Sequence, residues 1–287
     1  MIKRVALSVP FPGVSRVLEE GEKLGLWEFI TLDGSPVKIP DADQYILGGY
    51  TEGYDYLIRL LSNWSKSIGI LWTSSAGELD LEPIEKEYLD RMLKDERVKF
   101  IWFGDPVLGT MFRKGFCAPY PIKIQMQDVL PKRDIVTLWC PATLKKNILN
   151  QLVAISLIQR TADVELHTNV PLPKFSFPLK VQSYSSWLPR DELNALIASA
   201  RLNFAVSYAE TFNYQVAEAA MLGTPSIVSQ AIRWIKFPVI NPNDPDEIAD
   251  MGVKLLKNPE VHLLMCRKGL LDYFDLESLT SSLDKFL

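Results

Sequence analysis

The stretch FAVSYAETFNYQVAEAAMLGTPSIVS, residues 204–229, decides the fold of the second half of the chain. An apolar run is followed by a polar turn, a helix-compatible segment, a glycine and another apolar run, which predicts strand, helix and strand. Thr211 or Asn213 can cap the helix, and Gly223 with Pro225 behind it ends the helix. The stretch is therefore expected to form a βαβ unit.

This predicted unit suits an anionic ligand. The first turn of its helix faces the carboxyl end of the preceding strand, and backbone N–H groups in that position attract phosphate. Glu210 comes just before the helix and Glu218 nearly two turns into it, so the two stand roughly 10 Å apart along the axis. A nucleoside diphosphate sugar has about that separation between its sugar and its ribose.

Two glutamates eight residues apart are, by themselves, more often solvated surface residues than ligands. The neighbours of Glu218 favour a ligand role, because Ala217, Ala219 and Ala220 predict a helix packed closely between strands. An unpaired carboxylate would be costly in such a place.

The same alternation of short apolar strands and longer helical segments extends outward over the whole chain. It predicts an α/β protein with two Rossmann-like doubly wound domains, residues 1–130 and 131–287. The charged, Pro131-containing segment 128–133 is the predicted linker. A strand is expected at residues 122–125 as the last of the first domain.

The residues Ser207-x-x-Glu210-Thr-Phe-Asn followed by Glu218-Ala-Ala-Met-Leu-Gly-Thr-Pro225 resemble the Glu-x7-Glu signature of retaining GT-B glycosyltransferases of the family 4 type. The turn WLPRDEL at 187–193 is similar to the segment that precedes this signature in the family. Lys146-Asn147, after the predicted strand 135–139, is similar to the family's phosphate-binding pair. The resemblance covers about residues 134–276. It implies the GT-B arrangement, in which the two domains face a cleft and the final segment, residues 275–287, can pack back on the first domain.

This resemblance implies a role for each matching residue. Glu210 and Lys146 would be catalytic, with Glu210 on the hydroxyls of the transferred sugar and Lys146 on the leaving phosphate. Glu218 would accept hydrogen bonds from the ribose. The remaining donor-binding residues implied are Thr211, Phe212, Asn213, Lys145, Trp187 and Leu188, the last two beside the base.

The chain departs from the family at one position. The family has an arginine five or six residues before the lysine, where this chain has Pro141 and Cys140. Lys145, Arg233 and Lys236 are the cations that could replace it. Lys145 and Lys146 could also be solvated residues at a helix start, although cations there oppose the helix dipole.

The first half shows only the general α/β rhythm, so its candidates rest on position. Loops after parallel strands line the ligand crevice, which makes Gly13, Gly49, Ser74 and Asp105 acceptor-side candidates. Arg113-Lys114, next to Met111, Phe112 and Phe116, is compatible with a weak peripheral membrane contact or an acceptor phosphate. An amphipathic surface loop explains the same pattern equally well.

The amino-acid composition limits the classes of partner and the cellular compartment that are expected for the protein. The net charge of −4, with both signs intermixed, disfavours nucleic acid as a partner. The widely spaced Cys117, Cys140 and Cys266 predict core thiols in a reducing compartment, and the short apolar start favours a buried strand over a secretory signal, so we expect a cytoplasmic protein.

No metal site or cofactor is expected. Asp41-x-Asp43 and Asp244-x-Asp246 are explained as turn and helix-cap residues. His167 is expected to be structural and His262 to lie on a helix surface. The resemblance implies the predicted function, which is metal-independent transfer of a sugar, with retention, from a nucleotide-sugar donor to an unknown acceptor. The alternatives are a non-catalytic nucleotide-sugar or partner-binding module with a degenerate GT-B fold and, more distantly, an epimerase or phosphorylase.

Overall fold

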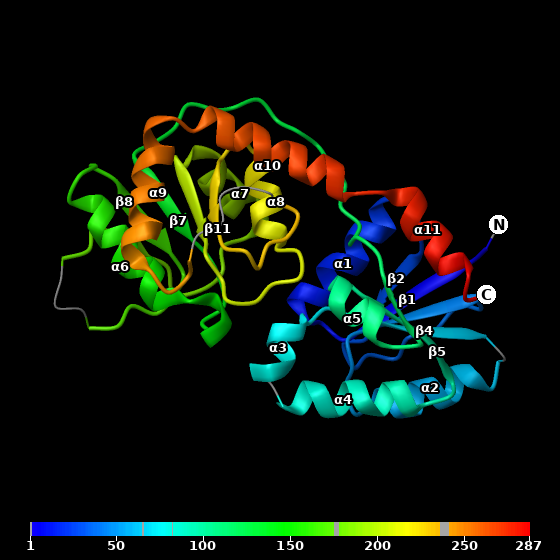
Figure 1. The fold of residues 1–287 in the computed structure, drawn as a ribbon. Helices are drawn as coiled ribbons and strands as arrows, with labels where there is room; N and C mark the ends of the chain where they lie inside the picture. Colours follow the sequence, from blue (N-terminus) through cyan, green and yellow to red (C-terminus); the bar gives the residue numbers. More distant parts are fainter. Residues whose placement is uncertain (1, 65, 82, 175–177, 236–240) are drawn as a thin grey trace. The chain divides into compact units, whose positions relative to one another are not determined.

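The computed structural model describes residues 2–64, 66–81, 83–174, 178–235 and 241–287. They form two compact units, unit 1 (Met1–Lys123 with Phe274–Leu287) and unit 2 (Ile124–Tyr273). Both units have a parallel sheet with helices on its two faces (Figure 1). The chain is therefore an α/β protein with Rossmann-like doubly wound units, as predicted.

Unit 1 contains a six-stranded parallel sheet with the order β2-β1-β3-β4-β5-β6. Its strands are β1 (Arg4–Ser8), β2 (Glu28–Thr31), β3 (Gln44–Gly48), β4 (Ser67–Trp72), β5 (Val98–Phe103) and β6 (Gly115–Cys117). Every residue of β1 and β3 is buried, as expected for central parallel strands covered on both faces. Gly69 in β4 is required by packing, since a Cβ there would lie 2.0 Å from the Phe100 ring.

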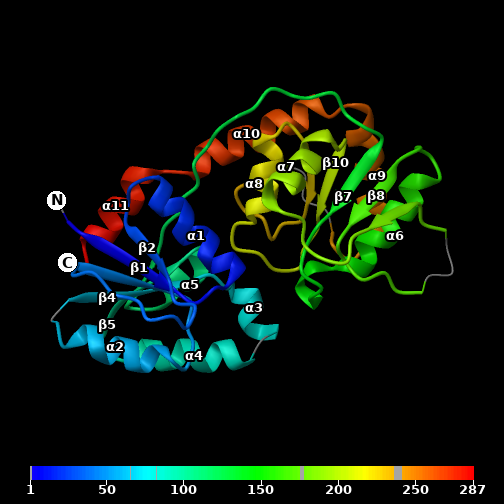
Figure 2. The same ribbon diagram turned by 180° about the vertical axis from the view of Figure 1, so that it is seen from behind.

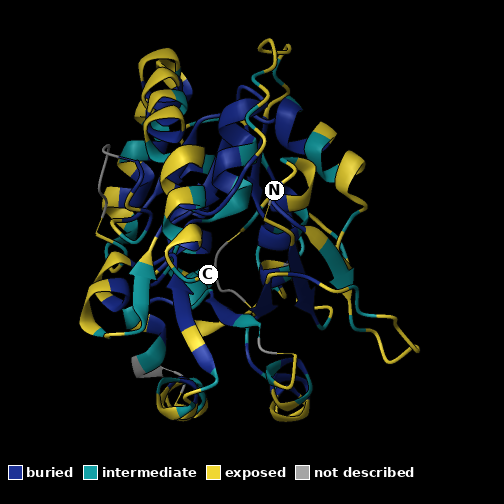
Figure 3. Ribbon diagram, turned by 90° about the vertical axis from the view of Figure 1, so that its right-hand side faces the viewer, coloured by how far each residue is buried: buried dark blue, intermediate teal, exposed yellow. Residues whose placement is uncertain are grey.

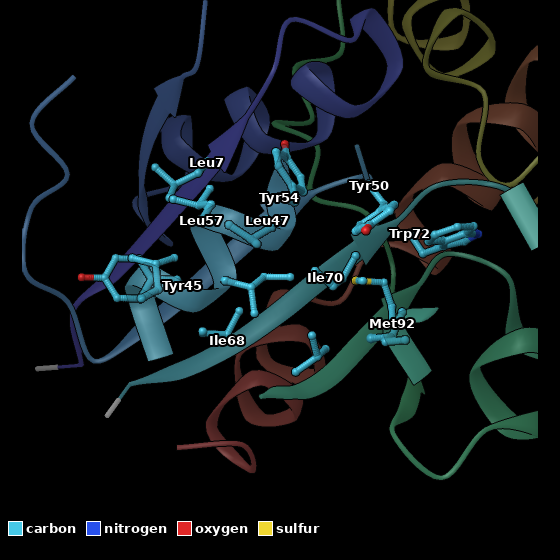
Figure 4. Close-up of a cluster of buried hydrophobic side chains, with 14 of the residues drawn as sticks. Leu7, Tyr45, Leu47, Tyr50, Tyr54, Leu57, Ile68, Ile70, Trp72 and Met92 are labelled. Atoms are coloured by element: carbon cyan, nitrogen blue, oxygen red, sulfur yellow. The ribbon is translucent and has the colours of Figure 1, made fainter. Parts of the chain in front are cut away.

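Helices cover both faces of this sheet. They are α1 (Pro12–Lys23), α2 (Tyr54–Ser62), α3 (Ala76–Leu81), α4 (Pro83–Lys94), α5 (Pro106–Met111) and α11 (Leu276–Asp284). In Figure 1, α2 and α4 lie on one face, and α1 and α11 on the other. Figure 4 shows the core between the sheet and α2, where Leu57 meets Leu7 and Leu47 from the strands.

The C-terminal segment packs on unit 1. Leu279 and Leu283 of α11 are fully buried, and Gln44 donates to the Leu283 carbonyl at 3.0 Å. Arg4 forms an ion pair with Asp284, and the Phe286 ring lies 4.8 Å from that of Phe100.

Unit 2 contains a five-stranded parallel sheet with the order β11-β10-β7-β8-β9. Its elements are β7 (Ile135–Leu138), α6 (Ile148–Gln159), β8 (Glu165–Thr168), β9 (Val181–Ser183), α7 (Arg190–Ser199), β10 (Leu202–Ala205), α8 (Tyr214–Met221), β11 (Ser226–Val228), α9 (Pro245–Lys257) and α10 (Glu260–Tyr273). Helices α6 and α9 cover one face, and α7, α8 and α10 the other (Figure 2). Buried residues concentrate in the strands and the inner helix faces (Figure 3).

The strand expected at 122–125 is not present. The last strand of unit 1 is β6, and the chain from Ala118 to Asp134 has no helix or strand. Amides within the expected range donate to side chains and not to a neighbouring strand. The Lys123 amide donates to the Glu20 carboxylate at 2.8 Å, and the Gln125 amide, already part of unit 2, donates to the Met221 sulfur at 3.3 Å.

Candidate functional site

The strand order of unit 2 creates one position where neighbouring loops diverge. The chain passes from β7 to β8 and β9 on one side, and then returns to place β10 on the other side of β7. The loops after β7 and β10 therefore separate at the carboxyl edge of the sheet, which is where open α/β sheets bind ligands. Figure 2 shows β7 and β10 side by side.

Lys146 and Glu210 meet at this position. Lys146 ends a short 3-10 helix (Leu144–Lys146) after β7, and Glu210 lies in the loop between β10 and α8. Their side chains form an ion pair and are only 13% and 10% exposed. Ser207 and Asn213 each donate to the same oxygen, Oε1 of Glu210, at 3.1 Å. The Glu210 carboxylate is thus held by side chains from both loops.

The Gln151 side chain and a backbone hydrogen bond also join the two loops. Gln151, on the first turn of α6, donates to the Lys146 carbonyl at 2.7 Å and accepts the Val206 amide at 2.9 Å. The Tyr208 amide donates to the Lys145 carbonyl at 2.7 Å. A glutamine in a helical segment gives no sequence signal for such a role, so sequence reasoning missed Gln151.

Helix α8 places Glu218 beside helix α7. Glu218, two turns after Glu210, forms an ion pair with Arg190, the first residue of α7. The Glu218 side chain is 13% exposed and that of Arg190 is 49% exposed. The sequence signature named Glu218 but not Arg190 as a site residue.

The start of α8 has unusual backbone geometry. Asn213 caps the helix in the left-handed region, at φ 66°, and its Oδ1 accepts the Val216 amide at 3.2 Å. The Phe212 ring is buried against Trp234 and Tyr273, and the Phe212 carbonyl accepts the Trp234 indole N–H at 2.6 Å. The side chain of Phe212 therefore belongs to the core, and Thr211 beside it is half-buried.

An aromatic cluster borders this edge. Trp187 is 55% exposed, and its ring lies 6.4 Å from that of Trp139, which follows β7. Tyr184 packs on Trp139 at 5.1 Å, and Leu188 joins the same apolar cluster. Among the described residues, the buried indole nitrogen of Trp139 has no hydrogen-bond partner.

Cys140 lies close to the Lys146–Glu210 pair. Burial raises the pKa of its thiol to about 12; Lys146 lowers it and Glu210 raises it further. The thiol is therefore protonated at neutral pH and is a poor nucleophile. Of the other replacement cations, Lys145 is half-buried and Arg233 is exposed, while Lys236 lies outside the described residues.

The acceptor-side candidates follow strands of unit 1. Gly13 and Gly49 come after β1 and β3, where the order of that sheet reverses, and Gly49 has φ 67°. Ser74 is half-buried after β4. Asp105, after β5, is buried and caps α5, accepting the amides of Ala76 at 3.0 Å and Val107 at 2.8 Å.

The segment considered for membrane contact is largely tied to unit 1. Lys114 donates to the Asp95 carbonyl at 2.6 Å, and burial lowers its pKa. The Phe112 ring packs on Phe103 and that of Phe116 on Phe100. In the part of the chain that the structure describes, no helix has the length and apolarity needed to cross a bilayer.

The expectation that His262 lies on a surface is wrong. It is 6% exposed, and its Nε2 is 2.7 Å from the Ser226 carbonyl. Apolar residues occur on both the buried and the exposed side of α10, so the sequence pattern does not show which face of this helix is buried. His167 is buried with its Nδ1 2.9 Å from the Tyr184 hydroxyl, which agrees with a structural role.

The carboxylates of the two Asp-x-Asp segments bind backbone and lysine groups. Asp43 accepts the Lys3 amide at 2.8 Å, Asp41 pairs with Lys66 at 3.4 Å, and Asp244 caps α9. No cluster of three or more His, Cys, Asp or Glu side chains suited to a metal ion occurs within the described ranges.

A pocket of about 470 Å³ adjoins the Glu210 loop. Its lining includes Ser207, Tyr208, Ser229, Gln230, Pro242 and Glu247. Ser207 therefore contacts Glu210 and also lines this space, which sequence reasoning did not anticipate.

No family model matches the sequence, and neither does any curated protein. Solved structures do match. An α,α-trehalose-phosphate synthase (UDP-forming) from Burkholderia vietnamiensis has a TM-score of 0.67 at 13% identity, covering 99% of both chains. A sucrose-phosphate synthase from Thermosynechococcus elongatus has a TM-score of 0.68 at 14% identity, covering 99% of this chain and 98% of its own.

TarM of S. aureus, in a structure that contains UDP, has a TM-score of 0.63 at 11% identity, covering 85% of this chain and 55% of its own. The chain therefore has the GT-B fold of these glycosyltransferases, as predicted.

Proposed function

We propose that the chain transfers a sugar from a nucleotide-sugar donor to an acceptor, with retention and without a metal. Unit 2 binds the donor at the diverging loops of its sheet. The observation that carries this proposal is the pairing of Lys146 with Glu210 there, on loops from β7 and β10. The GT-B fold shared with UDP-forming synthases supports it.

Departure of a nucleoside diphosphate builds negative charge on the leaving phosphate. Lys146 and the N-terminus of α8 both supply positive charge at the edge where that phosphate would lie. In this proposal the lysine ammonium moves its contact from Glu210 to the phosphate as the donor binds. The carboxylate is then available to accept hydrogen bonds from the sugar hydroxyls.

The contacts that hold Glu210 orient it for this task. Ser207 and Asn213 keep donating to its Oε1, so the carboxylate stays in place when the lysine leaves. Glu218 accepts the ribose hydroxyls, and exposed Trp187 with Leu188 borders the base. The acceptor binds at the loops of Gly13, Gly49, Ser74 and Asp105 in unit 1.

The test is loss of transfer in Glu210→Ala and Lys146→Ala. Loss of a charge-stabilising contact in the transition state lowers kcat by about 10²–10³-fold. Lys180→Ala is the matched control, because its pair with Asp163 is exposed on both sides. Turnover unchanged in both site variants, with circular dichroism showing folded proteins, would remove the mechanism. NMR of the product anomer, with and without EDTA, tests retention and metal independence.

A non-catalytic module that binds a nucleotide sugar is the second candidate. It is favoured by one observation: each carboxylate of the site already pairs with a cation, which gives a stable, charge-balanced surface without any reaction. It predicts donor binding with neither transfer nor donor hydrolysis. The same assays separate it from the transferase.

A further inference from the structure

The two ion pairs of the site differ in how tightly they are enclosed. Lys146 and Glu210 are both nearly buried, whereas Arg190 is 49% exposed above the 13% exposed Glu218. An ion pair with one exposed partner contributes little stability, since water competes for the guanidinium. Arg190 can therefore leave Glu218 at low cost when another group takes its place.

We propose that Arg190 exchanges partners on donor binding: the ribose hydroxyls replace its guanidinium on Glu218, and Arg190 turns to the donor's diphosphate. This inference rests on the proposed function and adds to it a residue that positions the donor. Arg190 begins α7, directly after the turn that carries Trp187 and Leu188, so it stands at the same edge as the first turn of α8.

Charge balance at the site favours such a residue. A diphosphate entering this edge is repelled by the carboxylates of Glu210 and Glu218, and their paired cations are Lys146 and Arg190. When sugar and ribose hydroxyls take over the carboxylates, both cations become available to the phosphates. The planar guanidinium fork matches two phosphate oxygens, which favours arginine for this contact.

The exchange has opposite consequences for charged and neutral ligands. For a nucleoside diphosphate, the new contact of Arg190 with phosphate outweighs the lost contact with Glu218. For the nucleoside alone, Arg190 has no phosphate to bind and only competes with the ribose for Glu218. Removing the guanidinium should therefore weaken the first ligand and strengthen the second.

The experiment measures the dissociation constants of both ligands for the wild type, Arg190→Gln and Arg190→Lys. The diphosphate is whichever of UDP, GDP, ADP and TDP the wild type binds most tightly, titrated by calorimetry, and its nucleoside is titrated by NMR. Arg160→Gln is the control, since exposed Arg160 ends α6 at the opposite edge of the sheet.

In Arg190→Gln we expect the diphosphate to bind about tenfold more weakly and the nucleoside about threefold more tightly. Arg190→Lys should recover part of the diphosphate affinity, and the control should change neither constant by more than about twofold. Equally weaker binding of both ligands would show that Arg190 has only a structural role. Equally tighter binding of both would show that Arg190 only competes for Glu218 and does not bind phosphate. Either result overturns the exchange while leaving the proposed donor binding intact. If no diphosphate binds the wild type, the proposed function itself fails, and the exchange with it.

Discussion

Among single residues, Glu210 makes the contacts that define the site, and they all involve its Oε1. It accepts hydrogen bonds from Ser207 and Asn213 and pairs with Lys146, so donors from two loops converge on one atom. The sequence signature predicted Glu210 and Lys146 as partners of the same ligand. It could not predict that they contact one another, because their 64-residue separation leaves the pairing to the strand order.

Arg190 was not predicted for a related reason. Its pairing with Glu218 depends on how α7 packs against α8, and arginine at the start of a helix is ordinarily a solvated residue. Only the packed structure distinguishes it from the other exposed arginines.

A prediction at this scale concerns His262. Burial lowers its pKa from the ordinary value of 6.5, while its hydrogen bond to the Ser226 carbonyl raises the pKa in part. At pH values between the folded-state pKa of His262 and 6.5, the unfolded chain therefore binds more protons than the folded chain. The contribution of the neutral imidazole to the free energy of unfolding is complete above pH 6.5, and it is lost as the pH falls through the folded-state pKa.

We expect His262→Gln to flatten the dependence of the free energy of unfolding on pH in the range just below 6.5, measured by urea denaturation at a series of pH values. The slope of His262→Gln is compared with that of His167→Gln, which should also be flatter than the wild-type slope, because burial lowers the pKa of His167 as well. An unchanged slope in His262→Gln would contradict the account of a neutral, buried imidazole.

At the scale of single helices and strands, the sequence predicted the elements well where turn-forming residues bound the apolar runs. The strand, helix and strand expected over residues 204–229 are present as β10, α8 and β11, and the strand expected at 135–139 is present as β7, because turn-forming residues such as Asn213 and Gly223 separate the apolar runs. The strand expected at 122–125 is not formed, and apolar periodicity could not show this, because it does not register that the Lys123 amide donates to the distant Glu20 carboxylate. The three-residue β6 is too short to give a pattern.

Asn213 joins the start of α8 to the site, and its two roles can be separated. Asn213→Gly should retain most of the stability, since glycine tolerates the φ of 66° and costs only a few tenths of a kcal/mol as a helix cap. It should nevertheless lower kcat about tenfold, because Glu210 loses the Nδ2 donor.

Asn213→Ala should, in contrast, lower the free energy of unfolding by about 1–2 kcal/mol, from the lost cap and the strained φ. Thermal denaturation and kinetic assays on both variants check this. Equal stability of the two variants would contradict the assignment of Asn213 as a left-handed cap.

At the scale of the whole molecule, α11 returns to complete the core of unit 1. Leu283 is fully buried there, so Leu283→Ala should lower the free energy of unfolding of unit 1 by about 2–5 kcal/mol through a cavity. Binding of a nucleotide by unit 2 should persist. Leu287→Ala, at a 54% exposed position of the same unit, is the control.

Scanning calorimetry with and without nucleotide measures both effects. Two results would contradict the assignment of α11 to unit 1 and of nucleotide binding to unit 2. One is a destabilisation by Leu283→Ala no greater than that by the control, and the other is loss of nucleotide binding under conditions in which Leu283→Ala is folded.

A thermal-shift titration with UDP, GDP, ADP and TDP sugars tests most directly whether unit 2 binds a nucleotide sugar between Glu210 and Glu218. We expect one donor to raise Tm in proportion to the logarithm of its concentration, as binding to the folded state alone requires, and Glu218→Ala to lose most of that rise. No change in Tm with any of the four donors at millimolar concentration would contradict the claim.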